Sequence, residues 1–395
     1  MLKVTPFHPR TAALSQGMAW RRWAGHTVLS SYELYHDREY SAIRNTAALI
    51  DVSPLYKYAI TGPDAARLLD RVLPRDMTKA QLHQVLYTPW CDTAGKVIDD
   101  GTISRLDDQR YRLTSADPNL RWLSQNAVGM DVTIEDVSDT IGAVSLQGPT
   151  SRDILKTLAD ADLDGLRFFR LTHASIRGIP VTISRTGYTG DLGYEIWVDA
   201  GRALELWDAL IDGGEDYGIT PAGILALDVA RIEAGLLMIE VDYVSAHRAL
   251  IEAQKSSPYE LGLGWTVSVE KGPFVGQSAL ADELRRGPAW QFRGIEVAWE
   301  SLEQLYAEVG LPPRIPTVAW RTSAPIYVQG VQVGYATSGC WSPLLKKYIA
   351  MAHLEAGYAQ VGTPVHMEVT VEHRRKEAKA RVARLPFLDL ERKRA

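Results

Sequence analysis

The sequence is poor in cysteine and contains no long apolar run. Its 395 residues include only two cysteines, Cys91 and Cys340, too few for a disulfide framework or a cysteine-rich zinc site. No apolar stretch approaches the roughly 20 residues that a membrane-spanning helix needs, and the first residues lack the continuous apolar segment of a signal peptide. We therefore expect a cytoplasmic protein with no membrane partner.

Basic charge is not in excess either. The formal net charge is −5, whereas non-specific binding of nucleic acids needs a basic surface that neutralises phosphates. One local exception is the basic segment from His373 to Ala395. We interpret it as a solvated strand face followed by a frayed terminus, so the sequence predicts no nucleic-acid partner.

Several common site motifs are missing as well. No G-x-G-x-x-G follows a strand, and neither G-x-x-x-x-G-K-[ST] nor G-x-S-x-G occurs. The nine histidines are scattered and form no H-E-x-x-H pattern. The sequence therefore predicts no metal site and gives no support for nicotinamide, P-loop or serine-hydrolase chemistry.

What is present is a mixture of helical and strand periodicity. A strand over 56–60 is followed by Gly-Pro and a helix over 65–72, which Asp64 is placed to cap. A second strand over 143–146 is again followed by Gly-Pro and a helix over 151–158, a weak internal repeat. Beyond residue 310, many proline, valine and tyrosine residues indicate an all-β domain. Because strands and helices do not alternate strictly, we expect an α+β fold.

The first half of the chain carries further predicted elements. Residues 1–50 read as helical and aromatic, with a helix over 37–46. Short strands joined by polar turns are expected over 84–88, 96–98, 101–106 and 110–114.

The first segment that stands out runs from Tyr87 to Asp100 and ends on adjacent carboxylates, Asp99 and Asp100. Neighbours in a strand point to opposite faces, so both cannot face one pocket. One is expected to be buried and functional, and the other wet or capping the turn. From the pattern alone, turn-forming acids and a catalytic carboxylate both remain open.

The second segment runs from Arg185 to Ile196 and contains three glycines within seven residues. Alternating residues on both sides make it a loop between two strands. Glu195 sits between aromatic and aliphatic neighbours, where its carboxylate could accept hydrogen bonds from a heterocycle that carries N–H and amino donors. An ordinary glycine-rich hairpin is the alternative.

These two segments resemble the aminomethyltransferase family, which includes the T-protein of the glycine cleavage system. The resemblance covers nearly the whole chain. Its six motifs follow the family's order: Ala47–Ser53, Ala94–Asp100, Leu146–Pro149, Arg185–Ile196, Arg231–Leu236 and Ser338–Lys347.

The resemblance implies a three-domain cloverleaf around a central folate channel. It implies a discontinuous first domain over 1–50 plus 142–265, a second folate-binding domain over 51–141, and a C-terminal, barrel-like β domain over 285–390. The cofactor it implies is tetrahydrofolate.

The resemblance also assigns roles to four residues. Asp100 matches the catalytic aspartate near the folate nitrogens that accept the carbon, and Glu195 matches the glutamate that holds the pterin ring. Tyr87 and Tyr188 match positions that line the folate site. A carboxylate at Asp100 can orient a nitrogen and manage its proton or a developing positive charge.

The chain departs from the T-protein pattern on the side of the carbon donor. Leu227 stands where a T-protein has an arginine, and Trp90 and Cys91 make the loop before Asp100 bulkier. Ser115–Asp117 is similar to the folate-dependent demethylase branch of the family. We therefore expect a demethylase that moves a methyl group from a small methylated donor to tetrahydrofolate.

Three alternatives remain. The first is a true aminomethyltransferase, whose partner is lipoylated H-protein and whose product is 5,10-methylene-tetrahydrofolate. The second is a folate-binding regulator without activity. The third is the folate protein of iron–sulfur and tRNA modification, whose Lys-Gly-Cys motif lacks its cysteine in Lys271–Gln277.

Overall fold

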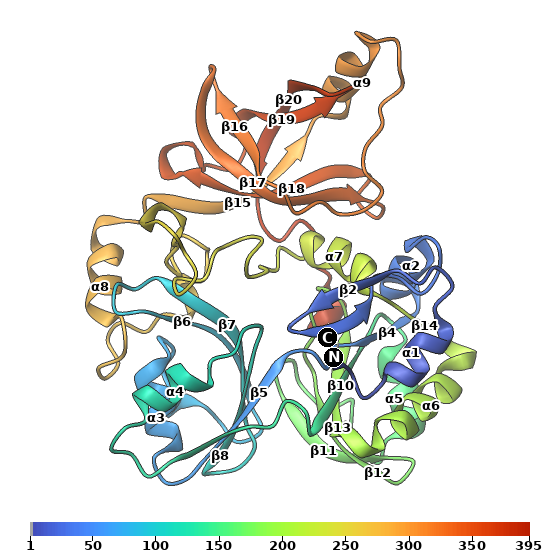
Figure 1. The fold of residues 1–395 in the computed structure, drawn as a ribbon, viewed down its shortest axis with the longest axis vertical. Helices are drawn as coiled ribbons and strands as arrows, with labels where there is room; N and C mark the ends of the chain where they lie inside the picture. The colour runs from blue at the N-terminus through green and yellow to red at the C-terminus, as the bar shows by residue number, and fades with distance from the viewer. Residues whose placement is uncertain (1–2) are drawn as a thin grey trace.

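The computed structural model describes residues 3–395. Three lobes are visible in Figure 1: a six-stranded sheet with its helices, a five-stranded sheet with its helices, and a closed six-stranded barrel. A small three-stranded sheet near the N-terminus adds to the first lobe. The predicted α+β class with a C-terminal barrel is confirmed, while the predicted domain boundaries stay a prediction.

The first lobe is built on a sheet whose strands come from distant parts of the chain. Their order is β11-β12-β13-β10-β4-β14. The strands are β4 (Ala47–Asp51), β10 (Ile141–Gln147), β11 (Leu171–Ile176), β12 (Ile179–Ser184), β13 (Gly193–Asp199) and β14 (Ile219–Pro221). The helices of this lobe are α1 (His8–Leu14), α2 (Asp37–Asn45), α5 (Ser151–Leu158), α6 (Ala203–Gly214) and α7 (Ile224–Glu233).

The second lobe has strand order β6-β7-β8-β5-β9. Its elements are β5 (Tyr56–Thr61), α3 (Ala65–Val72), β6 (Val85–Cys91), β7 (Val97–Arg105), β8 (Arg110–Ser115), α4 (Leu120–Asn126) and β9 (Thr133–Asp136). The strands predicted over 96–98 and 101–106 are one strand, β7. The carboxylates at 99 and 100 therefore lie inside a strand rather than at its end.

The predicted repeat of strand, Gly-Pro and helix occurs in both lobes, as β5–α3 and β10–α5. Each repeat needs glycine, because Gly62 and Gly148 have φ of +126° and +131° and lie against backbone atoms. Asp64 does not cap α3 with its side chain; its Oδ2 instead accepts from the Asp131 amide at 2.9 Å. The capping prediction is wrong here because the carboxylate joins α3 to the segment before β9.

The barrel closes in the order β15-β18-β17-β16-β19-β20. Its strands are β15 (Trp290–Val297), β16 (Ala324–Val328), β17 (Val331–Ser342), β18 (Lys347–Glu355), β19 (Pro364–Val371) and β20 (Arg374–Ala383). Helix α8 (Gln277–Arg286) precedes the barrel, and α9 (Trp299–Ala307) follows its first strand.

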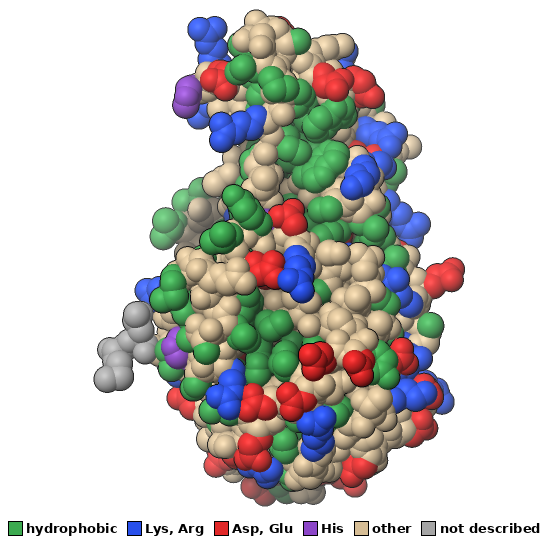
Figure 2. Space-filling model, turned by 90° about the vertical axis from the view of Figure 1, so that its right-hand side faces the viewer, with side chains coloured by type: hydrophobic (Ala, Val, Ile, Leu, Met, Phe, Trp, Pro, Cys, Tyr) green, Lys and Arg blue, Asp and Glu red, His purple; other side chains and the backbone are tan. Residues whose placement is uncertain are grey.

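The N-terminal segment differs from its prediction. Trp20–Trp23 is strand β2, which pairs with β3 (His26–Leu29), and β3 pairs with β1 (Lys3–Val4). Charged side chains of both signs are interspersed on the face drawn in Figure 2, in keeping with the small net charge. Among residues 3–395, no helix is both long and apolar enough to cross a membrane.

A buried charge network ties the first lobe to the barrel. Arg44 of α2 donates to Glu233 of α7 at 2.7 Å and to Asp191 at 3.1 Å. Glu233 also accepts from Tyr40 at 2.6 Å and from Ser342 of β17 at 2.5 Å. Because Glu233 is fully buried, its partners in α2 and β17 hold these two elements against α7.

Candidate functional site

A cavity of about 1400 Å³ has walls that come from all three lobes. It is large enough for an extended small molecule. Its walls include four of the residues singled out by the resemblance, namely Tyr87, Asp100, Tyr188 and Glu195. The fold thus brings to one cavity residues that are far apart in the sequence.

Asp100 lies on β7 and is held by two tyrosine hydroxyls. Tyr87 of β6 donates to Asp100 Oδ2 at 2.8 Å, and Tyr243, from the segment after α7, donates to Oδ1. Burial raises the pKa of Asp100, while the two tyrosine hydrogen bonds act in the opposite direction by stabilising the carboxylate. The site therefore holds a carboxyl group whose affinity for a proton is increased.

Asp99 points away from Asp100, as strand geometry requires. It is fully buried, and its carboxylate accepts from the Asp117 amide at 3.0 Å and from Asn119 Nδ2 at 2.8 Å. Burial and the charge of Asp100 raise its pKa. The expectation that one of the two carboxylates is wet or caps a turn is therefore wrong. Asp99 is a buried hydrogen-bond acceptor that holds residues 117–119 in place.

Glu195 lies on β13, opposite Ser184 of β12 and Ser145 of β10. Its Oε2 accepts from Thr186 Oγ1 at 2.6 Å. Burial raises its pKa, and the Thr186 hydrogen bond and the charge of Arg112 oppose that rise. The Arg112 guanidinium lies 4.1 Å from the ring centre of Trp197, two residues along the same face of β13. Glu195 thus accepts one hydrogen bond from Thr186 and lies near the positive charge of Arg112, which is not itself part of the cavity wall.

The glycine-rich loop between β12 and β13 wraps around the amide of Gln147. Thr189 Oγ1 donates to Gln147 Oε1 at 2.7 Å, and Gln147 Nε2 donates to the Thr186 carbonyl at 3.2 Å. A Cβ at Gly187 would lie 2.2 Å from Gln147 Oε1, and one at Gly193 would lie 2.3 Å from its Cδ. The glycines therefore permit close approach to Gln147. The loop presents Tyr188, whose hydroxyl donates to the Leu237 carbonyl.

Comparison with known proteins gives matches over most of the chain. Residues 9–271 match the GCVT N-terminal domain, and residues 309–389 match the glycine cleavage T-protein C-terminal barrel domain. The aminomethyltransferase of Caldanaerobacter subterraneus subsp. tengcongensis is 34% identical over 83% of this chain and 82% of its own length. That of Moorella thermoacetica is 32% identical over 98% of each chain.

The chain belongs to the glycine cleavage T-protein family. It is a transferase, as its aminomethyltransferase relatives are. The crystal structure of glycine cleavage system aminomethyltransferase T from Bartonella henselae shares the fold. Its TM-score is 0.82 at 24% identity, covering 98% of this chain and 99% of that one.

Two residues predicted on the donor side of this T-protein fold lie elsewhere. Trp90 and Cys91 are both 0% exposed and do not line the cavity. Trp90 Nε1 donates to Asn119 at 3.1 Å, and its ring stacks on Trp122 in the core of the second lobe. Burial raises the pKa of the Cys91 thiol. Trp90 packs in the core of the second lobe and Cys91 in a separate core cluster that includes Leu280 and Phe292, which the bulk of the loop does not reveal.

Leu227 does line the cavity, as do the residues of the segment 115–117. Beside Leu227, two arginines from other parts of the chain also reach the cavity: Arg21 of β2 and Arg321 before β16. Position 227 is thus apolar, but cations line the same cavity.

Sequence reasoning missed Tyr243, Arg21 and Arg321. Tyr243 is 143 residues away from its partner Asp100, and it belongs to none of the six motifs. Arg21 lies in the aromatic segment 20–23, which the sequence places in a helical region. Only the tertiary fold brings these side chains to the cavity.

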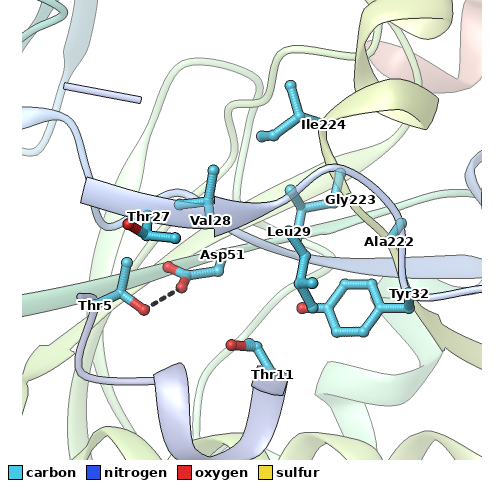
Figure 3. Close-up of a pocket in the computed structure, with 11 residues that line it drawn as sticks. Thr5, Thr11, Thr27, Val28, Leu29, Tyr32, Asp51, Ala222, Gly223 and Ile224 are labelled. Carbon is cyan, nitrogen blue, oxygen red and sulfur yellow. Dashed lines mark hydrogen bonds between the residues drawn. The ribbon is translucent and has the colours of Figure 1, made fainter. Parts of the chain in front are cut away.

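A second, much smaller cavity of about 10 Å³ lies under β3 (Figure 3). Its wall includes Asp51, which accepts from Thr5 Oγ1 at 2.6 Å and from the Ser53 amide at 3.0 Å. The space is about that of a single water molecule. The aspartate of the motif Ala47–Ser53 therefore joins the N-terminal segment to β4.

Proposed function

We propose that the chain transfers a one-carbon unit to tetrahydrofolate in the central cavity. The observation that carries the proposal is that Asp100 and Glu195 line the same cavity. One is a carboxylate held by two tyrosines, and the other is a half-buried acceptor that shares the cavity wall with aromatic side chains. They fit the two needs of the reaction, a group beside the reacting nitrogen and an acceptor for the donors of a pterin.

Glu195 supports the binding half of this proposal. Its Oε2 is partly used by Thr186, so lone pairs remain for N–H and amino groups of a heterocycle. Tyr188 and Trp197 add aromatic surface to the same wall. These residues would hold the ring while Asp100 faces the nitrogens that accept the carbon.

Asp100 supports the chemical half. In its ionised form, it can accept a proton from the folate nitrogen or stabilise a positive charge that develops there. The hydroxyls of Tyr87 and Tyr243 fix the direction of both carboxylate oxygens. Retention of a carboxylate at this position favours an enzyme over a folate-binding regulator.

For the carbon donor, we propose the aminomethyl group carried by lipoylated H-protein. The relatives are aminomethyltransferases. Of the features that favoured a small methyl donor, Trp90 and Cys91 lie outside the cavity, and Arg21 and Arg321 provide cations beside Leu227. Transfer would break the carbon–sulfur bond to the lipoyl arm and give 5,10-methylene-tetrahydrofolate, ammonia and H-protein with its lipoyl arm as the free dithiol.

Demethylation of a small methylated compound is the second candidate. Leu227 is the observation that favours it, because an apolar side chain in the wall cannot make the charge-assisted bonds of a guanidinium.

A reconstituted assay decides between the donors. One reaction receives tetrahydrofolate and H-protein that carries the aminomethyl arm, and the other receives tetrahydrofolate and a panel of small methyl donors. Methylene-folate and ammonia in the first reaction alone support aminomethyl transfer. Methyl-folate in the second reaction alone supports demethylation. No product and no tetrahydrofolate binding would reject both.

A further inference from the structure

Beside Leu227, the cavity wall carries a pair of arginines that share one carboxylate. Arg321 donates to Asp228 Oδ2 through Nε at 2.9 Å and through Nη2 at 2.5 Å. Arg21 Nη1 lies 3.6 Å from the same oxygen. Asp228 also pairs with the buried Arg231 at 3.4 Å, and Arg231 pairs with Asp242. Three arginines therefore face two carboxylates, which leaves one positive charge in this cluster.

The two arginines face the cavity, whereas Asp228 lies behind them. The Arg21 and Arg321 side chains are 29% and 31% exposed and line the cavity. The Asp228 side chain is 1% exposed and is not part of the wall. A ligand in the cavity would therefore meet the guanidinium groups and not the carboxylate.

Arg21 has an unused hydrogen-bond donor. Its Nη1 is buried and has no hydrogen-bond partner among residues 3–395, since 3.6 Å permits an ion pair but not a hydrogen bond. Burial and the charge of Arg321 lower the pKa of Arg21. This nitrogen lies toward Asp228, so the exposed remainder of the Arg21 side chain is the part that a ligand in the cavity would meet.

We propose that Arg21 and Arg321 bind a carboxylate of a reactant and so replace the cation that is absent at position 227. A carboxylate carries one negative charge, which matches the single net positive charge, and its two oxygens can accept two parallel hydrogen bonds from a guanidinium. The apolar side chains of Leu227 and Ile224 line the same cavity and suit the apolar part of an organic acid. The inference rests on the proposed function, because the carboxylate belongs either to the glutamyl part of tetrahydrofolate or to a small carbon donor.

Calorimetry on the full chain tests the proposal with Arg21→Met, which removes no hydrogen bond of the fold. The probes are tetrahydrofolate, 6-methyltetrahydropterin without a glutamyl part, and benzoate added to the tetrahydrofolate-loaded protein. Benzamide serves as the uncharged counterpart of benzoate. Arg38→Met is the matched control, since Arg38 is an exposed arginine outside the cavity.

If folate supplies the carboxylate, Arg21→Met should weaken tetrahydrofolate binding about tenfold or more and leave 6-methyltetrahydropterin unchanged. If the donor supplies it, Arg21→Met should instead weaken benzoate by a similar factor, and benzamide should bind poorly to every variant. Arg21→Lys should recover part of either loss, because lysine restores the positive charge but not the pair of parallel hydrogen-bond donors.

The proposal is overturned if Arg21→Met and the unchanged protein bind tetrahydrofolate equally and no benzoate binding depends on Arg21. A protein that binds no tetrahydrofolate at all would reject the proposed function instead.

Discussion

The two tyrosines on Asp100 set its proton affinity, so their removal should move the pH dependence of the reaction. Tyr243→Phe deletes one hydrogen bond to the carboxylate, which raises the pKa of Asp100 further above its ordinary value. The acid limb of the kcat/KM profile should therefore move to higher pH, by about one unit.

Rate measurements from acid to neutral pH test this shift. Tyr87→Phe should act in the same direction, because it also donates to Asp100. Tyr327→Phe, in barrel strand β16, should leave the profile unchanged. A Tyr243→Phe profile that moves to lower pH would show that the ionised carboxylate is not the active form.

Glu195 should matter for affinity. Glu195→Ala removes a half-buried hydrogen-bond acceptor that would hold a pterin, and the expected loss is about 1.5–3 kcal/mol of binding free energy. Calorimetric titration with tetrahydrofolate measures it. Unchanged affinity would place the pterin elsewhere.

Asp99 provides a contrast within the same strand. Both oxygens of the Asp99 carboxylate accept hydrogen bonds, three in all. Asp99→Asn replaces one of these oxygens by an amide nitrogen, which can only donate, so we expect a loss of about 1–3 kcal/mol in unfolding free energy. Urea unfolding measures this loss, and turnover of the folded fraction should remain close to that of the unchanged protein.

At the scale of elements, the loop between β12 and β13 depends on small residues against Gln147. Gly193→Ala would place a Cβ 2.3 Å from the Gln147 side chain, which is itself held by Thr186 and Thr189. We expect about 1–3 kcal/mol of destabilisation, the range for overpacking, and weaker tetrahydrofolate binding. Gly272→Ala is the control, because a Cβ there meets nothing within 4 Å. Equal effects of the two substitutions in urea unfolding and calorimetry would contradict this account of the loop.

Sequence patterns predicted some of these elements closely. Helices α3 and α5 begin and end where their amphipathic spacing places them. The single strand β7 and the strand β2 were missed, because polar residues in β7 and the aromatic–basic pattern of β2 hide their pairing partners. For the site, the motifs indicated the segments that carry Asp100 and Glu195. The placement of Trp90 required knowledge of which face of β6 points into the cavity, and Tyr243 lies in no motif and reaches Asp100 only through the tertiary fold.

At the scale of the molecule, the network around Glu233 should govern how the first lobe and the barrel stay together. Glu233→Gln leaves the buried Arg44 with only Asp191 as an anionic partner. Breaking a buried pair costs about 3–5 kcal/mol, and the remaining ion pair keeps the loss near the lower value. Glu205→Gln removes an exposed pair with Arg202 and should leave the free energy of unfolding nearly unchanged, because solvent screens exposed ion pairs. Urea unfolding compares the two. A loss at Glu233 no larger than at Glu205 would show that the network does not hold the lobes.

The central claim is that this T-protein-like cavity transfers a one-carbon unit to tetrahydrofolate with the Asp100 carboxylate beside the reacting nitrogen. The most direct test is a single-turnover measurement of methylene-folate formation from tetrahydrofolate and aminomethyl-loaded H-protein, comparing the unchanged protein with Asp100→Asn. Both proteins should bind tetrahydrofolate with nearly equal affinity, and the variant should react about 10²–10⁴-fold more slowly. Equal rates for the two proteins would contradict the role of Asp100.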